Sequence, residues 1–273
     1  MIVKVLAENT AYLKDYEAEH GLSLYIETGK LKILFDVGKS DVFLRNAKKL
    51  GVDISNVDLV VISHGHIDHG GGLKYFLKEN TKALIYIHPK AFGSYYSKYL
   101  DGLKFIGLDE GLECNDRIIF TTERFFIDKG VEVFSNVPGK EQLSKCNKAL
   151  MKEEEGKIVE DTFEHEQNMI VTEAGKMFVF AGCAHNGIVN ILNHSIDLKK
   201  RAPDYVFGGF HLYSNSAKKS EDPDFVRRIG EMLKNTNIKY YTCHCTGVDP
   251  YNQLKDIMGD KIEYLATGRV IKI

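Results

Sequence analysis

The sequence has no tryptophan and only five prolines among its 273 residues. It contains no run of about 18 apolar residues, which a membrane-spanning helix would need. Its first residues do not show the basic segment followed by an apolar one that is typical of a secretion signal. The five cysteines are odd in number and scattered, so they do not indicate a disulfide framework. We therefore expect a cytoplasmic protein in a reducing environment.

The charge and composition are those of an ordinary globular protein. The formal net charge is −2, and 44% of the residues are hydrophobic while 27% are charged. A chain of this length can bury a sizeable core, and we expect a single domain over residues 1–273. Because this balance supplies no broad positive surface, nucleic acid is not an expected partner. No membrane partner is expected either. The expected partner is a small-molecule substrate, which carries a phosphate group in the main functional hypothesis.

Short apolar runs and amphipathic stretches alternate along the chain in an α/β pattern. The run DLVVIS at 58–63 is almost wholly apolar, which indicates a strand buried on both faces. Gly29-Lys30 and Ala174-Gly175-Lys176 each separate two β-rich runs, which predicts two hairpins. The pattern predicts a sandwich of sheets with helices outside. The expected strands are 22–28, 31–37, 58–63, 83–88, 168–173, 177–182, 204–209 and 239–244, and the expected helices are 40–52, 71–80, 187–200 and 222–235.

One long segment, 139–166, is polar and rich in charged residues. An exposed loop or a short helix is the simpler interpretation of this composition. The alternative is a lid over a binding site, since long irregular segments inside a compact domain are often functional.

The segment SHGHIDHGG places His64, His66, Asp68 and His69 directly after the predicted strand 58–63. Imidazole and carboxylate groups are common ligands of zinc and similar cations. Without a metal, three imidazoles in near contact would repel one another on protonation and lose solvation. In an extended segment, His64 and His66 can point the same way, while Asp68 and His69 turn toward the other side of the pocket. This arrangement suits two adjacent metals that activate a bridging water.

Three further histidines follow predicted strands. His185 lies in AGCAHNG, His211 in GGFHL and His244 in TCHCTG. An α/β sheet binds ligands beyond the carboxyl ends of its strands, so we expect these side chains to meet the His64–His69 segment. Alternation sends Phe210 and Leu212 away from His211 and into the core.

The remaining histidines and two cysteines are expected to be structural. Cys243 and Cys245 flank His244, and alternation along a strand would point both of them away from it, which favours packing roles. The histidines expected to be hydrogen-bonded surface or core residues are His20, His88, His165 and His194.

These motifs resemble those of a known family. SHGHIDHGGG is similar to the signature of the metallo-β-lactamase superfamily, and the resemblance covers nearly the whole chain. HGLSLYIET, EHEQNMIV, AGCAHNGIVNIL, GGFHL and HCTG resemble the subgroup of 7,8-dihydropterin-6-yl-methyl-4-(β-D-ribofuranosyl)aminobenzene 5′-phosphate synthase-like proteins. The resemblance implies a four-layer αβ/βα sandwich with a dinuclear metal site at one edge.

The resemblance also implies roles for individual residues. Asp36 in LFDVG is similar to an aspartate that orients the metal-binding loop without touching the metal. Most members carry a bridging aspartate where this chain has Cys183, so we expect Cys183 to be a weaker ligand or a near neighbour and the second metal to be loosely held. His165 is an alternative third histidine of the pattern. The expected metal ligands are His64, His66, Asp68, His69, His185 and His244.

The main functional hypothesis is a metal-dependent hydrolase that acts on a phosphate-bearing small molecule through a metal-activated water. Asp68 would be both a ligand and a proton acceptor, and His211 would bind or protonate the leaving oxygen. One or two divalent metals are expected, zinc first, with iron or manganese as alternatives. The second hypothesis is a transferase that condenses a dihydropterin-methyl diphosphate with a ribofuranosylaminobenzene phosphate. The third is a non-catalytic metal-bound sensing or redox domain.

Overall fold

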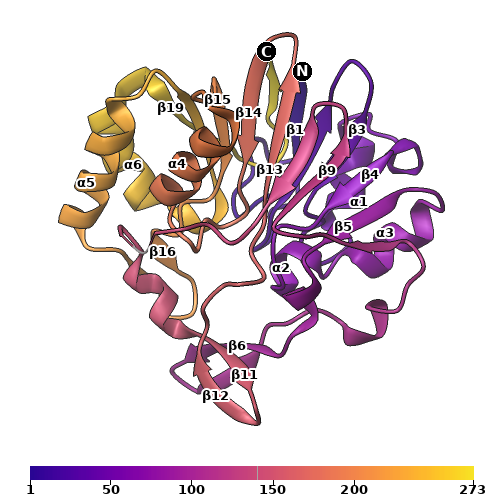
Figure 1. Cartoon of the computed structure of the whole chain (residues 1–273), viewed down its shortest axis with the longest axis horizontal. Helices are drawn as coiled ribbons and strands as arrows, with labels where there is room; N and C mark the ends of the chain where they lie inside the picture. The colour runs from indigo at the N-terminus through magenta and orange to yellow at the C-terminus, as the bar shows by residue number, and fades with distance from the viewer. Residues whose placement is uncertain (140) are drawn as a thin grey trace.

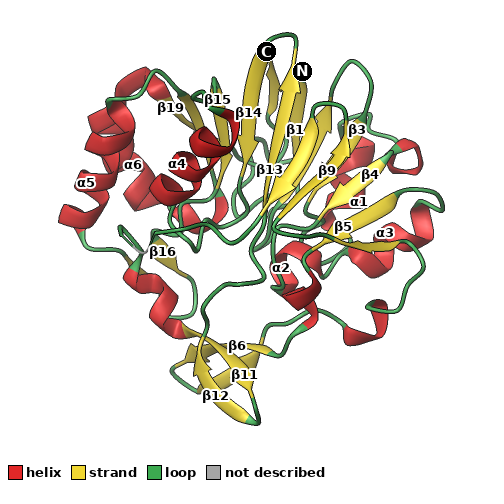
Figure 2. Cartoon of the chain, in the orientation of Figure 1, coloured by secondary structure: helices red, strands yellow, loops and turns green. Residues whose placement is uncertain are grey.

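Two seven-stranded sheets face each other at the centre of the molecule (Figures 1 and 2). The computed structural model describes residues 1–139 and 141–273. The first sheet has, in spatial order, β20 (Val270–Lys272), β1 (Ile2–Ala7), β2 (Ser23–Glu27), β3 (Lys32–Phe35), β4 (Leu59–Val61), β5 (Leu84–Ile87) and β8 (Ile118–Phe120). The second has β19 (Ile262–Tyr264), β18 (Lys239–Thr242), β15 (Tyr205–Gly208), β14 (Lys176–Phe180), β13 (Asn168–Glu173), β10 (Val131–Phe134) and β9 (Arg124–Asp128).

Alternation along the strands explains how the sheets and helices form four layers. In β4, Leu59 and Val61 lie in the core between the two sheets, while Val60 packs with Phe43 and Phe76 of the helices outside the first sheet. A strand buried on both faces is nearly continuous in apolar residues, as this one is. The predicted sandwich and both predicted hairpins, β2–β3 and β13–β14, are confirmed.

Helices cover the outer face of each sheet (Figure 2). On the first sheet they are α1 (Val42–Lys49) and α3 (Leu73–Glu79), and on the second they are α4 (Ile188–Lys199), α5 (Pro223–Lys234) and α6 (Val248–Met258). The short α2 (Ile67–Gly70) lies at the edge where the strands end. In α5, the Asp222 side chain accepts hydrogen bonds from the backbone N–H groups of Asp224 and Phe225 and so caps the helix. No helix within the described residues is long and apolar enough to cross a membrane.

Parallel pairing brings several strand ends to one edge of the sandwich. Strands β3, β4, β5 and β8 run parallel in the first sheet, and β14, β15, β18 and β19 run parallel in the second. The carboxyl ends of parallel strands share one edge, which is where α/β sheets bind ligands. The loops after β3, β4, β14, β15 and β18 carry the residues that the sequence predicts for the site.

A smaller four-stranded sheet lies beyond this edge, at the bottom of Figures 1 and 2. Its order is β12 (Lys157–Glu160), β11 (Leu150–Glu154), β6 (Tyr95–Tyr99) and β7 (Gly102–Phe105). The segment 139–166, expected as a loop or short helix, thus contains the β11–β12 hairpin after a 3₁₀ helix, η4 (Lys145–Ala149). The pairing of Leu150 with Ser97 explains the difference, because it depends on residues about fifty positions apart that local polarity cannot reveal.

The remaining short elements connect these layers. The described residues include a two-stranded ribbon of β16 (Tyr213–Ser214) and β17 (Lys219–Ser220). The other 3₁₀ helices are η1 (Ile54–Asn56), η2 (Pro89–Phe92), η3 (Glu110–Leu112), η5 (His244–Thr246) and η6 (Gly259–Lys261).

A substitution at Gly208, the last residue of β15, tests how tightly the backbone is packed at the edge where the parallel strands end. Its φ is +140°, and a Cβ atom there would lie 2.0 Å from the carbonyl oxygen of Ala181. We expect Gly208→Ala to lower the free energy of unfolding by about 2–4 kcal/mol, through both backbone strain and overpacking. Gly175→Ala is the matched control, because Gly175 also has a positive φ but no heavy atom lies within 4 Å of its Cβ position. Denaturant titration of both variants measures the difference, and equal losses would contradict the packing argument.

Candidate metal centre

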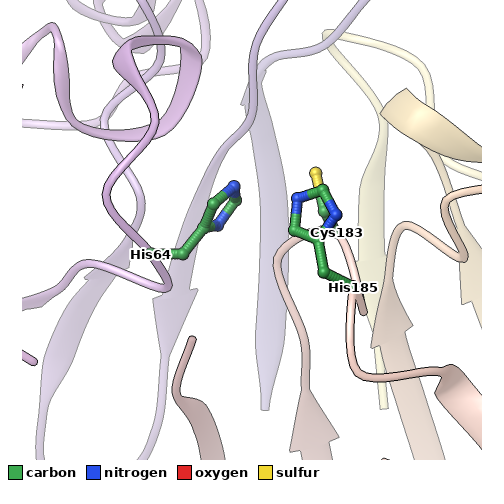
Figure 3. Close-up of side chains that lie close together, drawn as sticks. All are labelled: His64, Cys183 and His185. Carbon is green, nitrogen blue, oxygen red and sulfur yellow. The ribbon is translucent and has the colours of Figure 1, made fainter. Parts of the chain in front are cut away.

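Three histidine rings converge where β4 and β14 end. The ring centroids of His64 and His66 are 4.6 Å apart, and both lie about as close to His185, at 5.0 and 5.2 Å. His64 and Gly65 precede α2, and Gly65 is required there because a Cβ would lie 2.3 Å from the carbonyl oxygen of Ala91. Figure 3 shows His64 and His185 approaching from opposite sides, with the sulfur of Cys183 beside them.

The Nε2 atoms of these three histidines are buried without a hydrogen bond, although Asp161 Oδ2 lies 3.9 Å from that of His66. His64, His66 and His185 each have an Nε2 atom without a hydrogen-bond partner among the residues that the structure describes. Burying such an atom costs free energy unless something binds it. Ligand atoms of His64, Cys183 and His185 lie within 4.8 Å of one another. We call His64, His66 and His185 the first donor group.

The opposite ring nitrogens of His64 and His185 have partners that fix the tautomer. The Nδ1 atom of His185 lies 3.0 Å from Asn147 Oδ1, so it carries the proton and leaves a lone pair on Nε2. His64 Nδ1 lies 2.8 Å from Ser63 Oγ, whose own proton goes to Asp36. Burial lowers the pKa of His64 and of His185 well below the usual value, and the neighbouring imidazoles lower it further. Both rings are therefore neutral, as metal binding requires.

A second donor group lies beside the first and consists of Asp68, His69 and His244. The Nε2 atoms of His69 and His244 are 3.2 Å apart, and Asp68 Oδ2 lies 3.2 Å from His244 Nε2 and 3.8 Å from His69 Nε2. Asp36 accepts a hydrogen bond from His69 Nδ1 at 2.7 Å, and Asn9 Oδ1 accepts one from His244 Nδ1 at 2.8 Å. Asp36 thus contacts the ring nitrogen of His69 that faces away from His244 and Asp68.

The charges in the second donor group favour a cation. Burial opposes the ionisation of Asp68, but the charge of His69 and a hydrogen bond from His244 outweigh it and hold the pKa of Asp68 well below its usual value. Burial likewise lowers the pKa of His244, yet its hydrogen bond to Asp68 raises that pKa to about 9. A proton on His244 thus balances the carboxylate in the protein alone, and a metal would displace it.

Cys183 lies between the two donor groups. Its Sγ atom is 3.2 Å from His69 Nε2, and it belongs both to the cluster with His64 and His185 and to the cluster with His69 and His244. Burial raises the pKa of its thiol well above the usual value, so a metal would have to displace a proton here too. Gly182 lets the backbone before Cys183 pass close to Ser63, because a Cβ on residue 182 would lie 2.2 Å from Ser63 Oγ.

The donor chemistry and the unpaired atoms fit one or two divalent transition metals. Imidazole nitrogen, carboxylate oxygen and one sulfur are the ligands that zinc and iron accept. The expected ligands His64, His66, Asp68, His69, His185 and His244 all lie in these two groups, and Cys183 adjoins both.

His211 lies next to the first donor group. Its ring centroid is 4.2 Å from that of His185, and both of its ring nitrogens are buried without a partner among the described residues. Phe210 and Leu212 are buried in the core, as predicted, although β15 ends at Gly208 and strand alternation does not extend to them. The expectation that Cys245 packs away from the site is corrected, because its sulfur lies in one cluster with Cys183 and His211. The strand ends at Thr242, so alternation does not extend to Cys245 in η5.

Strained backbone supports several of these side chains. Asp36, Ala184, His211 and His244 have φ between +48° and +59°, a region that non-glycine residues seldom occupy. Such conformations persist only where the surrounding structure imposes them, and they concentrate at functional sites.

Two of the histidines that were expected to be structural lie close to the site. His20 Nε2 is 3.3 Å from Asp68 Oδ2, and burial lowers the pKa of His20 to about 4. His165 accepts a hydrogen bond from the Gly65 N–H and contacts Asp161 at 3.0 Å, so neither of its ring nitrogens is free for a metal. His165 therefore supports the loop rather than replacing His185. The contact of His20 with Asp68, like that of His165 with Gly65, joins residues far apart in the sequence and depends on tertiary packing.

The other two are structural, as expected. His88 caps η2 by accepting a hydrogen bond from the Lys90 N–H, and the ring of His194 packs against Phe134.

A cavity of about 250 Å³ opens over both donor groups. Asp68, Cys183, His211 and His244 form part of its floor. The small sheet and its connections supply part of the rim, including Tyr99, Phe105, Cys146 and Leu150. Cys146 and Leu150 belong to the segment 139–166, so this segment contributes to the lining of the cavity.

The fold and site together define a sandwich protein with a candidate dinuclear centre at its sheet edge. Residues 17–184 match the model of the metallo-beta-lactamase superfamily. The chain belongs to this superfamily, whose fold is that of metal-dependent hydrolases.

Similar proteins cover the chain from end to end. One is the 7,8-dihydropterin-6-methyl-4-(beta-D-ribofuranosyl)-aminobenzene-5′-phosphate synthase of Methanocaldococcus jannaschii, with 31% identity over 99% of this chain and 96% of that protein. An uncharacterized protein of the same organism has 30% identity over the full length of both chains. A crystal structure of a metal-dependent hydrolase of the beta-lactamase superfamily has 29% identity and a TM-score of 0.84, covering 100% of this chain and 99% of that one.

The residues behind the ligands provide a test of the two donor groups. We expect Asp36→Ala to weaken metal binding about 10–100-fold, because His69 loses the acceptor that fixes its tautomer. Asn147→Ala should do the same for the first donor group through His185. The measurement is the metal content of each variant, determined by mass spectrometry during competition with a chelator. Wild-type retention of metal by both variants, with the fold intact, would refute these roles.

Proposed function

We propose that the protein is a metal-dependent hydrolase that acts on a phosphate-bearing small molecule. The observation that carries this proposal is the pair of donor groups, adjoining at Cys183, on the floor of a cavity that can admit a ligand. Two adjacent divalent ions would lower the pKa of a water and stabilise the oxygens of a displacement. The rest of the proposal concerns what the protein's own residues do.

Asp68 and His211 are the proposed catalytic residues. Asp68 is held ionised and lines the cavity, so its carboxylate can accept a proton from an attacking water. His211 lines the same cavity with both ring nitrogens unpaired among the described residues, so it can donate a hydrogen bond or a proton to the leaving oxygen. The segment 139–166 forms part of the rim and is proposed to cover the bound substrate.

Zinc is the proposed metal, with iron and manganese as alternatives. The imidazoles and the sulfur of Cys183 are softer donors than the oxygens that manganese prefers. Burial raises the pKa of the Cys183 thiol, so binding a metal here would cost a deprotonation that an ionised carboxylate would not, which supports the proposal that the second metal is held more weakly.

A transferase is the second candidate, and the similarity to the Methanocaldococcus jannaschii synthase supports it because it extends over nearly the whole chain. In that case the cavity would hold the diphosphate leaving group, and the aromatic side chains of Tyr99, Phe105 and Tyr213 at its wall could contact flat rings. The two candidates differ in their products. Release of a phosphate group from one substrate alone supports the hydrolase, and diphosphate release only when a dihydropterin-methyl diphosphate and an aromatic ribosyl phosphate are both present supports the transferase.

Asp68→Ala tests the proposed proton acceptor. We expect this change to abolish turnover while most of the metal in the first donor group remains bound, because His64, His66 and His185 are untouched. Asp68→Asn is the matched variant, since it keeps the side-chain size and removes the charge. Metal analysis and a phosphoester assay check both variants, and near-normal turnover in either would show that the mechanism is wrong.

His211→Ala separates three roles for this histidine. As the donor to the leaving group, its loss should lower the rate by about 10²–10⁴-fold with metal content unchanged. A fall in metal content would instead make it a ligand, and a fall in melting temperature alone would make it structural. His194→Ala is the control for rate and metal content, because His194 belongs to neither donor group and does not line the cavity; only its melting temperature should fall, through the lost contact with Phe134.

A further inference from the structure

A second cavity adjoins the one over the donor groups. Its volume is about 630 Å³, and Tyr99, Cys146, Ser214 and Ser216 line both cavities. Its walls come from β6, η4 and the β16–β17 ribbon, none of which belongs to the two large sheets. We call it the lysine cavity, for the residues that distinguish it.

Four lysines line this cavity, namely Lys98, Lys145, Lys148 and Lys219. None of their ammonium groups forms an ion pair with a carboxylate in residues 1–139 or 141–273. The cavity over the donor groups has two lysines in its lining: Lys104 pairs with Asp101 at 2.7 Å, whereas Lys39 forms no ion pair within the described residues. Several lysines without ion pairs around one cavity create a positive potential that attracts an anion.

Two carboxylates in the same wall, Glu221 and Asp222, offset part of the charge of the four lysines, but each accepts its hydrogen bonds from neutral N–H and O–H groups and not from a lysine ammonium. Glu221 is buried, and its Oε2 accepts hydrogen bonds from Ser144 Oγ and from the backbone N–H groups of Lys145 and Cys146. Asp222 caps α5. Glu221 therefore anchors the start of η4 and holds the backbone that carries two of the lysines.

We propose that the lysine cavity binds the phosphate of a two-part substrate whose reacting bond lies over the donor groups. This inference rests on the proposed function and specifies its substrate class: a molecule with a phosphomonoester at one end and the bond to be broken at the other. Lysine ammonium groups bind phosphate as point charges, and the hydroxyls of Ser214, Ser216 and Ser220 line the same wall. Tyr99 and Leu100 give an apolar surface for the part of the substrate in between.

A phosphate held away from the reacting bond contributes to binding equally in the ground state and the transition state. Removing its partners should therefore raise KM and leave kcat nearly unchanged. This differs from the expected effect of changing Asp68 or His211, which act on the reacting atoms.

The test is calorimetric titration of ribose 5-phosphate into the metal-loaded protein. We expect Lys145→Gln/Lys148→Gln to weaken its binding about tenfold or more, since hydrogen bonds to charged groups are the stronger kind. Binding should also weaken as ionic strength rises from about 0.1 M to 1 M, and ribose itself should not bind. The control is Lys30→Gln/Lys129→Gln, which removes the same charge from a cavity of about 630 Å³ elsewhere in the molecule.

The outcomes separate this inference from the proposed function. His185→Ala should retain ribose 5-phosphate binding if the phosphate contacts lysines, and should lose it if the phosphate contacts the metals. Undiminished binding by Lys145→Gln/Lys148→Gln, or no binding by the wild-type protein, would overturn the inference. Phosphoester turnover is measured separately, so an inactive protein that still binds ribose 5-phosphate through these lysines would refute the hydrolase and leave the lysine cavity standing.

Discussion

The structure is organised around imidazole nitrogens that are buried without a partner in the protein. The Nε2 atoms of His64, His66 and His185 have lost their water and gained no hydrogen bond within the described residues. Each such atom costs about 1–3 kcal/mol, and the burial that lowers the pKa of His64 and His185 prevents a proton from satisfying them. A divalent cation would satisfy the atoms of His64 and His185 together, since their ligand atoms lie within 4.8 Å of each other. Metal binding is therefore coupled to the stability of the edge where the two sheets meet.

The orientation of the histidine rings in both donor groups depends on residues from separate parts of the fold. Asp36 follows β3, Asn9 follows β1 and Asn147 lies in η4, and each accepts a hydrogen bond from the Nδ1 atom of a different histidine. Because the partner of Nδ1 determines which lone pair Nε2 presents, the metal site requires both sheets and the peripheral 3₁₀ helix to be in place. A local motif such as HGHIDH supplies ligands but cannot orient them alone.

The sequence predicts what depends on local order along the chain. The run 58–63 reads as a buried strand because each of its faces meets a core, and the histidines after strands are recognisable because strand ends share an edge. The sequence does not predict the β11–β12 hairpin, because the stability of this hairpin depends on pairing with β6, which is far away in the sequence. Cys245 and His20 were assigned structural roles for a similar reason. The strand that would have turned Cys245 away ends at Thr242, and His20 reaches Asp68 only through tertiary packing.

The 3₁₀ helix η4 connects features that are distant from one another in the sequence. Within one helical turn, Asn147 binds His185, Cys146 lines both cavities, and Lys145 and Lys148 line the lysine cavity. Glu221 fixes the start of this turn through backbone hydrogen bonds. A displacement of η4 would therefore change the lysine positions and remove the hydrogen bond that orients His185. The elements outside the sandwich are thus part of the metal site's support, because one rigid turn carries contacts to both cavities.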